Sequence, residues 1–156
     1  MQGDVQVIEY LNRQLATELT AVNQYFLHAR MYGHWGYARL AEHEYKESIE
    51  EMKHADRLIR RILLLEGLPN MQHLGKLAVG GAVAAAIRGD LDLETGARVS
   101  LLEAVHYCES VRDYVSRELL DAILEDTEEH IDFLETQLQL IADVGLQNYL
   151  QAQLHS

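Results

Sequence analysis

The chain has 156 residues, which is long enough for one domain, and we expect a single domain over 1–156. Its formal net charge of −12 predicts a surface that attracts cations and repels nucleic acid. Its single cysteine, Cys108, excludes an internal disulfide framework, and the lack of any apolar run near about 18 residues excludes a membrane span. Since residues 1–5 resemble no export signal, we expect a cytoplasmic protein without a membrane partner.

Apolar residues that recur at steps of three and four predict four long helices and a short fifth. The first helix follows a suitable N-cap, Asp4, and ends before a glycine-containing break. The second is expected to end with Gly67 as its C-terminal cap, because Pro69 prevents continuation, and Gly145 ends the fourth. The expected helices span about 5–32, 37–66, 82–111, 113–144 and 146–154.

The lengths of these helices and of their connections predict how they pack. Helices of about 28–32 residues would each be about 42–48 Å long at 1.5 Å per residue. Short turns after the first and third helices make those pairs antiparallel, whereas the connection at 68–81 is long enough to run the length of a bundle. The sequence therefore predicts an all-α, ferritin-like antiparallel four-helix bundle with a long crossover between helices two and three and a short fifth helix.

Polar residues interrupt the apolar stripe of each long helix. Glu51 and His54 form Glu-x-x-His, a spacing that places an oxygen and a nitrogen ligand on one helix face. Burying an unpaired charge is costly, so such residues need partners or a metal. Each alone is compatible with a surface or structural role, but together they predict a site for iron, manganese or zinc. The candidate metal ligands are Glu18, Glu51, His54, Glu94 and His130.

Four segments resemble the bacterioferritin family, and the resemblance extends over essentially the whole chain. They read NQYFLHARM at 23–31, EEMKHAD at 50–56, ILLLEGLPN at 62–70 and GLQNYLQAQ at 145–153. The resemblance implies a hollow shell of twenty-four subunits that stores ferric mineral. It also implies haem b between two subunits and a di-iron centre in each subunit that oxidises ferrous iron with oxygen or peroxide. The five candidate ligands would then hold the iron at this centre.

The sequence departs from the family's pattern on the fourth helix. The family's second Glu-x-x-His reads Thr127-Glu-Glu-His130 here, so one of the two bridging carboxylates is missing. Four carboxylates balance two ferrous ions, whereas three leave charge uncompensated in a low-dielectric site. Glu128 cannot substitute, because one residue turns a side chain by about 100° around a helix. Lys46 and Glu50 also differ from the His and Asp usual in family members with an inner-surface iron site, and Lys46 would place a cation where iron would otherwise pass. We therefore expect weakened ferroxidase chemistry.

Met52 is the candidate haem ligand. It lies one residue past Glu51 and is expected to point outward, where a lone Met is usually interface packing. By the resemblance, Met52 and its two-fold mate are the axial ligands of one haem. Thioether ligation favours ferrous haem iron and fits an electron path that reduces stored mineral. Candidate haem-pocket residues, equally explained by interface packing, are Leu19, Trp35, Ile49 and Lys53.

Three functions remain open from the sequence. The first is an iron-storage subunit with haem that contributes electron transfer more than ferrous oxidation. The second is a full ferroxidase with an altered centre, and the third is a structural shell subunit whose metal residues are relics. The resemblance also allows for a second, ferroxidase-competent bacterioferritin subunit and a ferredoxin-type reductant as partners. Tyr25 is either a redox-active phenol beside the metals or a core residue.

Overall fold

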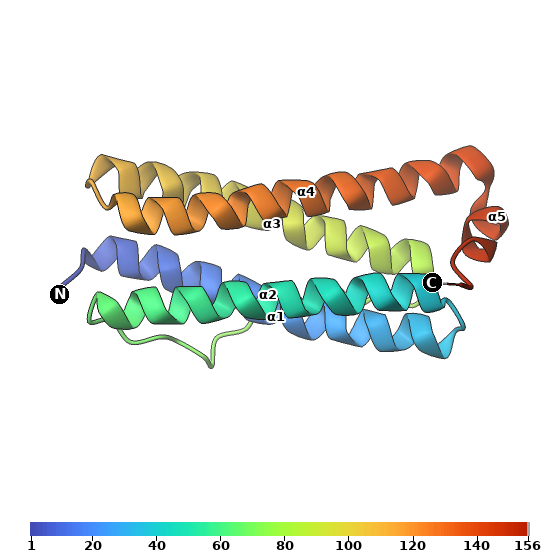
Figure 1. Cartoon of the computed structure of the whole chain (residues 1–156), viewed down its shortest axis with the longest axis horizontal. Coiled ribbons are helices and arrows are strands. Elements are labelled where there is room, and N and C mark those ends of the chain that lie inside the picture. The colour runs from blue at the N-terminus through green and yellow to red at the C-terminus, as the bar shows by residue number, and fades with distance from the viewer. Residues whose placement is uncertain (156) are drawn as a thin grey trace.

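The computed structural model describes residues 1–155 and confirms the predicted bundle (Figure 1). Helix α1 packs mainly against α2, and α3 mainly against α4, while the short α5 folds back at the end of α4 (Figure 1). No helix in this part of the chain is both long and apolar enough to cross a membrane. The helices are α1 (Val5–His34), α2 (Ala38–Leu64), α3 (Val83–Ser110), α4 (Tyr114–Val144) and α5 (Leu146–Gln151).

The ends of the first two long helices differ in how well the sequence predicted them. Asp4 caps α1 as expected, since its carboxylate accepts hydrogen bonds from two backbone amides of the first turn. The predicted glycine cap of α2 is wrong in detail. The residue with left-handed backbone is Glu66, at φ 62°, and not Gly67. Glycine is needed next to it for space, because a Cβ at Gly67 would lie 2.8 Å from Cγ2 of Ile8.

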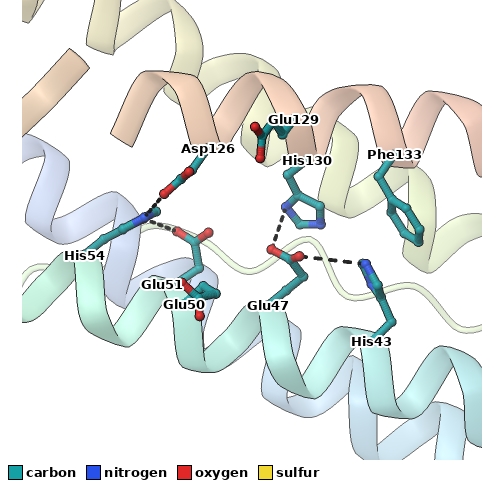
Figure 2. A pocket seen from close by; sticks show the side chains of 9 residues that line it. All are labelled: His43, Glu47, Glu50, Glu51, His54, Asp126, Glu129, His130 and Phe133. Atoms are coloured by element: carbon teal, nitrogen blue, oxygen red, sulfur yellow. Dashed lines mark hydrogen bonds and ion pairs between the residues drawn. The ribbon is translucent and has the colours of Figure 1, made fainter. Parts of the chain in front are cut away.

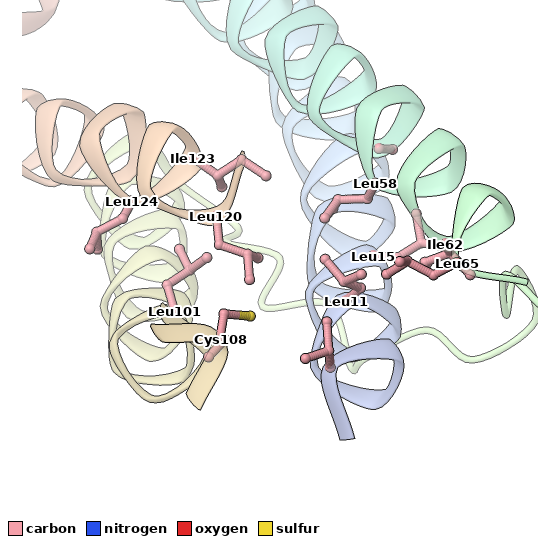
Figure 3. Packing of buried hydrophobic residues seen from close by; sticks show 13 residues of the cluster. Leu11, Leu15, Leu58, Ile62, Leu65, Leu101, Cys108, Leu120, Ile123 and Leu124 are labelled. Atoms are coloured by element: carbon pink, nitrogen blue, oxygen red, sulfur yellow. The ribbon is translucent and has the colours of Figure 1, made fainter. Parts of the chain in front are cut away.

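In the described residues, the apolar core lies mainly in two clusters at opposite ends of the bundle, because polar residues occupy the middle. The larger cluster lies near the N-terminus of α1, where Leu11, Leu58, Leu101 and Leu120 contribute from the four long helices (Figure 3). The smaller cluster lies at the α5 end and includes Tyr32. Between the clusters each long helix presents polar side chains to its neighbours, and this band contains the predicted metal ligands.

The crossover between α2 and α3 lies along α1 and is held there by side chains. The backbone amide of Gly75 donates to Oγ1 of Thr20 at 2.8 Å, and that of Ala78 donates to Oε1 of Gln24 at 2.8 Å. The crossover also touches α3, since a Cβ at Gly89 would lie 2.3 Å from the carbonyl oxygen of Ala78. Glycine is therefore required at this close approach.

An ion pair fastens the end of α2 to the turn between α3 and α4. Asp113 caps α4 through the amide and hydroxyl of Ser116, at 3.0 and 2.7 Å, and it accepts a hydrogen bond from Nη2 of Arg61 at 2.8 Å. Partial burial raises the pKa of Asp113, but the hydrogen bonds from Ser116 and the charge of Arg61 outweigh it and lower the pKa below its usual value. The charged form of this carboxylate therefore stabilises the fold.

We expect Asp113→Ala to lower the free energy of unfolding by about 1–2 kcal/mol at neutral pH, the usual cost of losing such a cap. Because the folded pKa is depressed, the contribution is present above the unfolded pKa of about 3.9 and is lost as pH falls through the folded pKa. Thermal unfolding at neutral and strongly acidic pH tests this, with exposed Asp121→Ala on the same helix as the control. An equal loss at both pH values would contradict the assignment.

Candidate metal centre

A cavity of about 370 Å³ opens between the middle of α2 and the middle of α4 (Figure 2). Three of the five predicted ligands line it, and the other two, Glu18 on α1 and Glu94 on α3, are buried beside it. The lining residues are His43, Glu47, Glu50, Glu51, His54, Asp126, Glu129, His130 and Phe133.

The structure brings together three predicted ligands from α1 and α2. Ligand atoms of Glu18, Glu51 and His54 all lie within 4.8 Å of one another. Nδ1 of His54 lies 3.4 Å from Oε2 of Glu18 and 3.6 Å from Oε2 of Glu51. Gln14 donates a hydrogen bond to the other oxygen of Glu18 at 2.8 Å, which fixes that carboxylate. This buried group offers two oxygens and one nitrogen to a cation.

Asp126 orients His54 and was not predicted. Nε2 of His54 lies 2.8 Å from Oδ2 of Asp126, so Nδ1 is directed at the two glutamates. A carboxylate behind a metal-binding imidazole is a common arrangement, because it fixes the ring and its tautomer. Burial lowers the pKa of His54, but Glu18 and Glu51 outweigh it and raise the pKa to about 11. The group therefore favours a positive charge at Nδ1, and a metal would replace a proton there.

A second group lies one helical turn away and shares Glu51 with the first. Ligand atoms of Glu47, Glu51 and His130 lie within 4.8 Å of one another. Nδ1 of His130 lies 3.7 Å from Oε2 of Glu47 and 3.0 Å from Oε1 of Glu94. Glu94 also accepts a hydrogen bond from the hydroxyl of Tyr25. The candidate ligands Glu94 and His130 thus meet, and Glu47 joins them without having been predicted as a ligand.

Tyr25 is a polar partner of the centre as well as a core residue. Burial, and then the neighbouring carboxylates of Glu94 and Glu51, raise the pKa of its phenol well above the usual value. The phenol is therefore protonated and donates to Glu94. Its ring packs edge-on against His130, with centroids 5.3 Å apart.

Thr127 is buried on α4 and lies one turn before His130, on the same helix face. Glu128 points away from the cavity, where its carboxylate accepts from Nε of Arg98 at 2.8 Å. The structure thus agrees with the expectation that Glu128 does not replace a carboxylate at position 127. The centre holds a short hydroxyl side chain at that position.

Two further departures from the family pattern lie at the edge of the cavity. Lys46 is outside the lining, and its ammonium pairs with Glu42 at 3.2 Å, so the cation that was expected on the path of iron is directed elsewhere. Glu50 does line the cavity, but its carboxylate pairs with Lys53 at 3.1 Å. His43 lines the cavity one turn of α2 before Lys46. Burial, His130 and Lys46 together lower the pKa of His43 to about 4, so it is neutral at neutral pH.

In a third group with metal-ligand composition, His28, Glu44 and Asp90, the imidazole and Asp90 belong to a hydrogen-bonded network, whereas Oε1 of Glu44 has no hydrogen-bond partner. The backbone amide of Gly80 donates to Nε2 of His28 at 3.1 Å, so the ring proton is on Nδ1, which lies 2.9 Å from Oδ1 of Asp90. Both nitrogens are therefore occupied. Burial, and then Asp90, raise the pKa of Glu44 well above the usual value. This network fastens the crossover to α1 and α3.

Met52 lies on the outer face of α2, away from the metal centre, and its side chain is 50% exposed. Tyr45 and Ile49 precede it at steps of four and three, so all three lie on one exposed helix face. Phe26 of α1 extends this apolar strip, with its ring centroid 6.4 Å from that of Tyr45. A soft sulfur within an apolar surface suits a porphyrin and its iron. Trp35 packs against Tyr32 at the α1–α2 turn, away from Met52 of the same chain.

Known proteins match this chain over nearly its whole length. The ferritin-like domain family matches residues 8–144. The bacterioferritin of Brucella melitensis is 51% identical over 151 residues, which cover 97% of this chain and 94% of that protein. The bacterial ferritin of Pseudomonas aeruginosa is 49% identical over 155 residues, covering 99% and 100%. The bacterioferritin of Mycobacterium tuberculosis is 46% identical over 149 residues, covering 96% and 94%.

Proposed function

Because the chain belongs to the bacterioferritins of the ferritin-like family, we propose that it is a cytoplasmic iron-storage subunit. In this proposal the subunit binds haem b and oxidises ferrous iron slowly at an altered centre. The observation that carries the proposal is the buried group of Glu18, Glu51 and His54 beside an open cavity. Carboxylate and imidazole donors suit iron, and buried carboxylates without a cation are costly.

Ferrous iron is the substrate of this centre, and each ion loses one electron to oxygen or peroxide. The cavity between α2 and α4 gives the ion access, and Asp126 keeps Nδ1 of His54 directed at it. Glu51 belongs to both ligand groups and connects them. Thr127 adds no second bridging carboxylate, so two ions are held together less firmly, which supports slow oxidation.

Met52 would hold the iron of a haem placed between two copies of the chain. The strip of Phe26, Tyr45, Ile49 and Met52 supplies an exposed apolar surface for it. When bound, haem would pass electrons to stored ferric iron and so reduce it. A ferredoxin-type protein would provide those electrons. The residues of this strip would exclude water from one face of the haem and present the sulfur of Met52 to its iron.

The proposed assembly is a shell of twenty-four subunits, either of this chain alone or mixed with a ferroxidase-competent bacterioferritin subunit. Exposed apolar side chains on several elements support large interfaces, among them Leu146 on α5 and Leu154 after it. The alternative function, a fully active ferroxidase, is favoured by one observation. Glu47 brings a further carboxylate to within 3.7 Å of His130.

Glu51→Gln tests the proposed function, because this residue belongs to both ligand groups. We expect the affinity for ferrous iron, measured by equilibrium binding under nitrogen, to fall at least about tenfold, since an amide cannot supply the negative charge. Glu50→Gln is the control, because that carboxylate also lines the cavity but pairs with Lys53. Equal binding by Glu51→Gln and the unmodified protein would contradict the proposal.

A further inference from the structure

We propose that Glu47, Glu51 and His130 hold a second divalent metal ion in this chain, with Glu47 supplying the carboxylate that Thr127 lacks. The proposal deepens the proposed function and rests on it for the first metal position, at Glu18, Glu51 and His54. It assigns to the α2 side of the centre a carboxylate that the family pattern supplies from the fourth helix.

The positions of these residues suit a metal ion. Glu47 lies four residues before Glu51, on the same face of α2, and faces His130 of α4 across the cavity (Figure 2). The three ligand atoms lie within 4.8 Å of one another, and Oε2 of Glu47 lies 3.7 Å from Nδ1 of His130. Ligand atoms about 2.1 Å from an ion are at most about 4.2 Å apart, so small side-chain rotations complete the site.

The carboxylate of Glu47 lacks a close partner although its side chain is only 24% exposed. The two imidazoles that face it, Nε2 of His43 and Nδ1 of His130, lie at 3.8 and 3.7 Å. Both distances exceed that of a hydrogen bond. A largely buried carboxylate without a hydrogen-bond partner is costly, and a cation bound between Glu47 and His130 would remove that cost.

The charge of the centre also supports two ions. Glu47 adds a fourth carboxylate to the three candidate ligands Glu18, Glu51 and Glu94, and four such charges would balance two divalent cations. No Lys or Arg is found among the residues that line the cavity in the described chain. Glu51 belongs to both groups and would bridge the ions alone.

Zinc binding to the assembled protein tests this proposal, because Zn²⁺ accepts the same donors and undergoes no redox change. Equilibrium titration against a competing chelator should count two tightly bound ions per chain in the unmodified protein. Glu47→Gln should retain one, whereas Glu50→Gln should retain two. Anomalous diffraction from zinc-loaded crystals should place the second ion between Glu47 and His130. Glu47→Asp, one methylene shorter, should weaken only the second binding event.

The number and place of the bound ions distinguish this proposal from the proposed function. Two ions in Glu47→Gln, or a second ion bound without contact to Glu47, would overturn the new site. One ion in the unmodified protein, at Glu18 and His54, would overturn it as well but leave the first position standing. No tightly bound ion at either position would overturn both. Light scattering on every variant confirms that the assembly is intact before ions are counted.

Discussion

Replacing Thr127 with Glu should accelerate ferrous oxidation by the assembled protein at least about tenfold, which corresponds to about 1.4 kcal/mol in the barrier. Thr127 is buried and lies on the face of α4 that carries His130, so a longer side chain there points at the same ions. The adjacent cavity of about 370 Å³ gives the new carboxylate room. A second bridge beside Glu51 would hold two ions close together for a shared oxidant.

Stopped-flow absorbance at about two ferrous ions per chain measures the effect of Thr127→Glu. Thr127→Gln is the matched control, because it has the same length as Glu without the charge, and it should stay slow. If the unmodified protein oxidises iron as fast as Thr127→Glu, slow oxidation is excluded. The chain would then be a fully active ferroxidase whose second position depends on Glu47.

Replacing Met52 with Leu should remove nearly all haem from the purified assembly, from one haem per two chains to almost none. Leu preserves the apolar volume of the exposed strip, so the proposed contacts with a neighbouring chain would be kept, but it has no sulfur to bind iron. Absorption spectroscopy and a haem assay normalised to protein measure the loss. The metal centre lies on the opposite side of α2, so ferrous oxidation should be unchanged.

Met71→Leu is the matched control for this experiment. Met71 is similarly exposed, at 51%, but lies on the crossover between α2 and α3. The same change of side chain there should leave the haem spectrum intact. A spectrum retained in Met52→Leu would show that another residue binds the haem iron, and Met52 would then be ordinary interface packing.

The helices and the polar stripes were predictable because they depend on spacing along one chain segment. Glu51 and His54 share a helix face whatever surrounds them, and the structure places both beside Glu18. Which side chains meet across helices depends on the rotation and axial stagger of each helix, and sequence spacing does not determine these. Asp126 and Glu47 were missed as partners of the two histidines for this reason.

Glu44 and Glu47 illustrate the difference. Both lie on α2, one turn apart, and nothing in the sequence distinguishes one from the other. Glu44 is buried beside His28 and Asp90, which hold the crossover, whereas Glu47 faces the open cavity. The end of α2 shows a similar limit. Gly67 suggested a left-handed cap, but Glu66 adopts that conformation and the glycine avoids a clash with Ile8.

The separation of the two apolar clusters affects how the metal-free bundle moves. The band between them is held by hydrogen bonds and ion pairs among buried acids and histidines, and α2 contacts α4 much less than α1 contacts α2. Local opening is easiest where apolar burial is least. Backbone amides in the middle of α2 and α4 should therefore exchange with deuterium faster than those at the two ends. Ions that join Glu18, Glu51 and His130 would cross-link three helices at this level and slow the exchange.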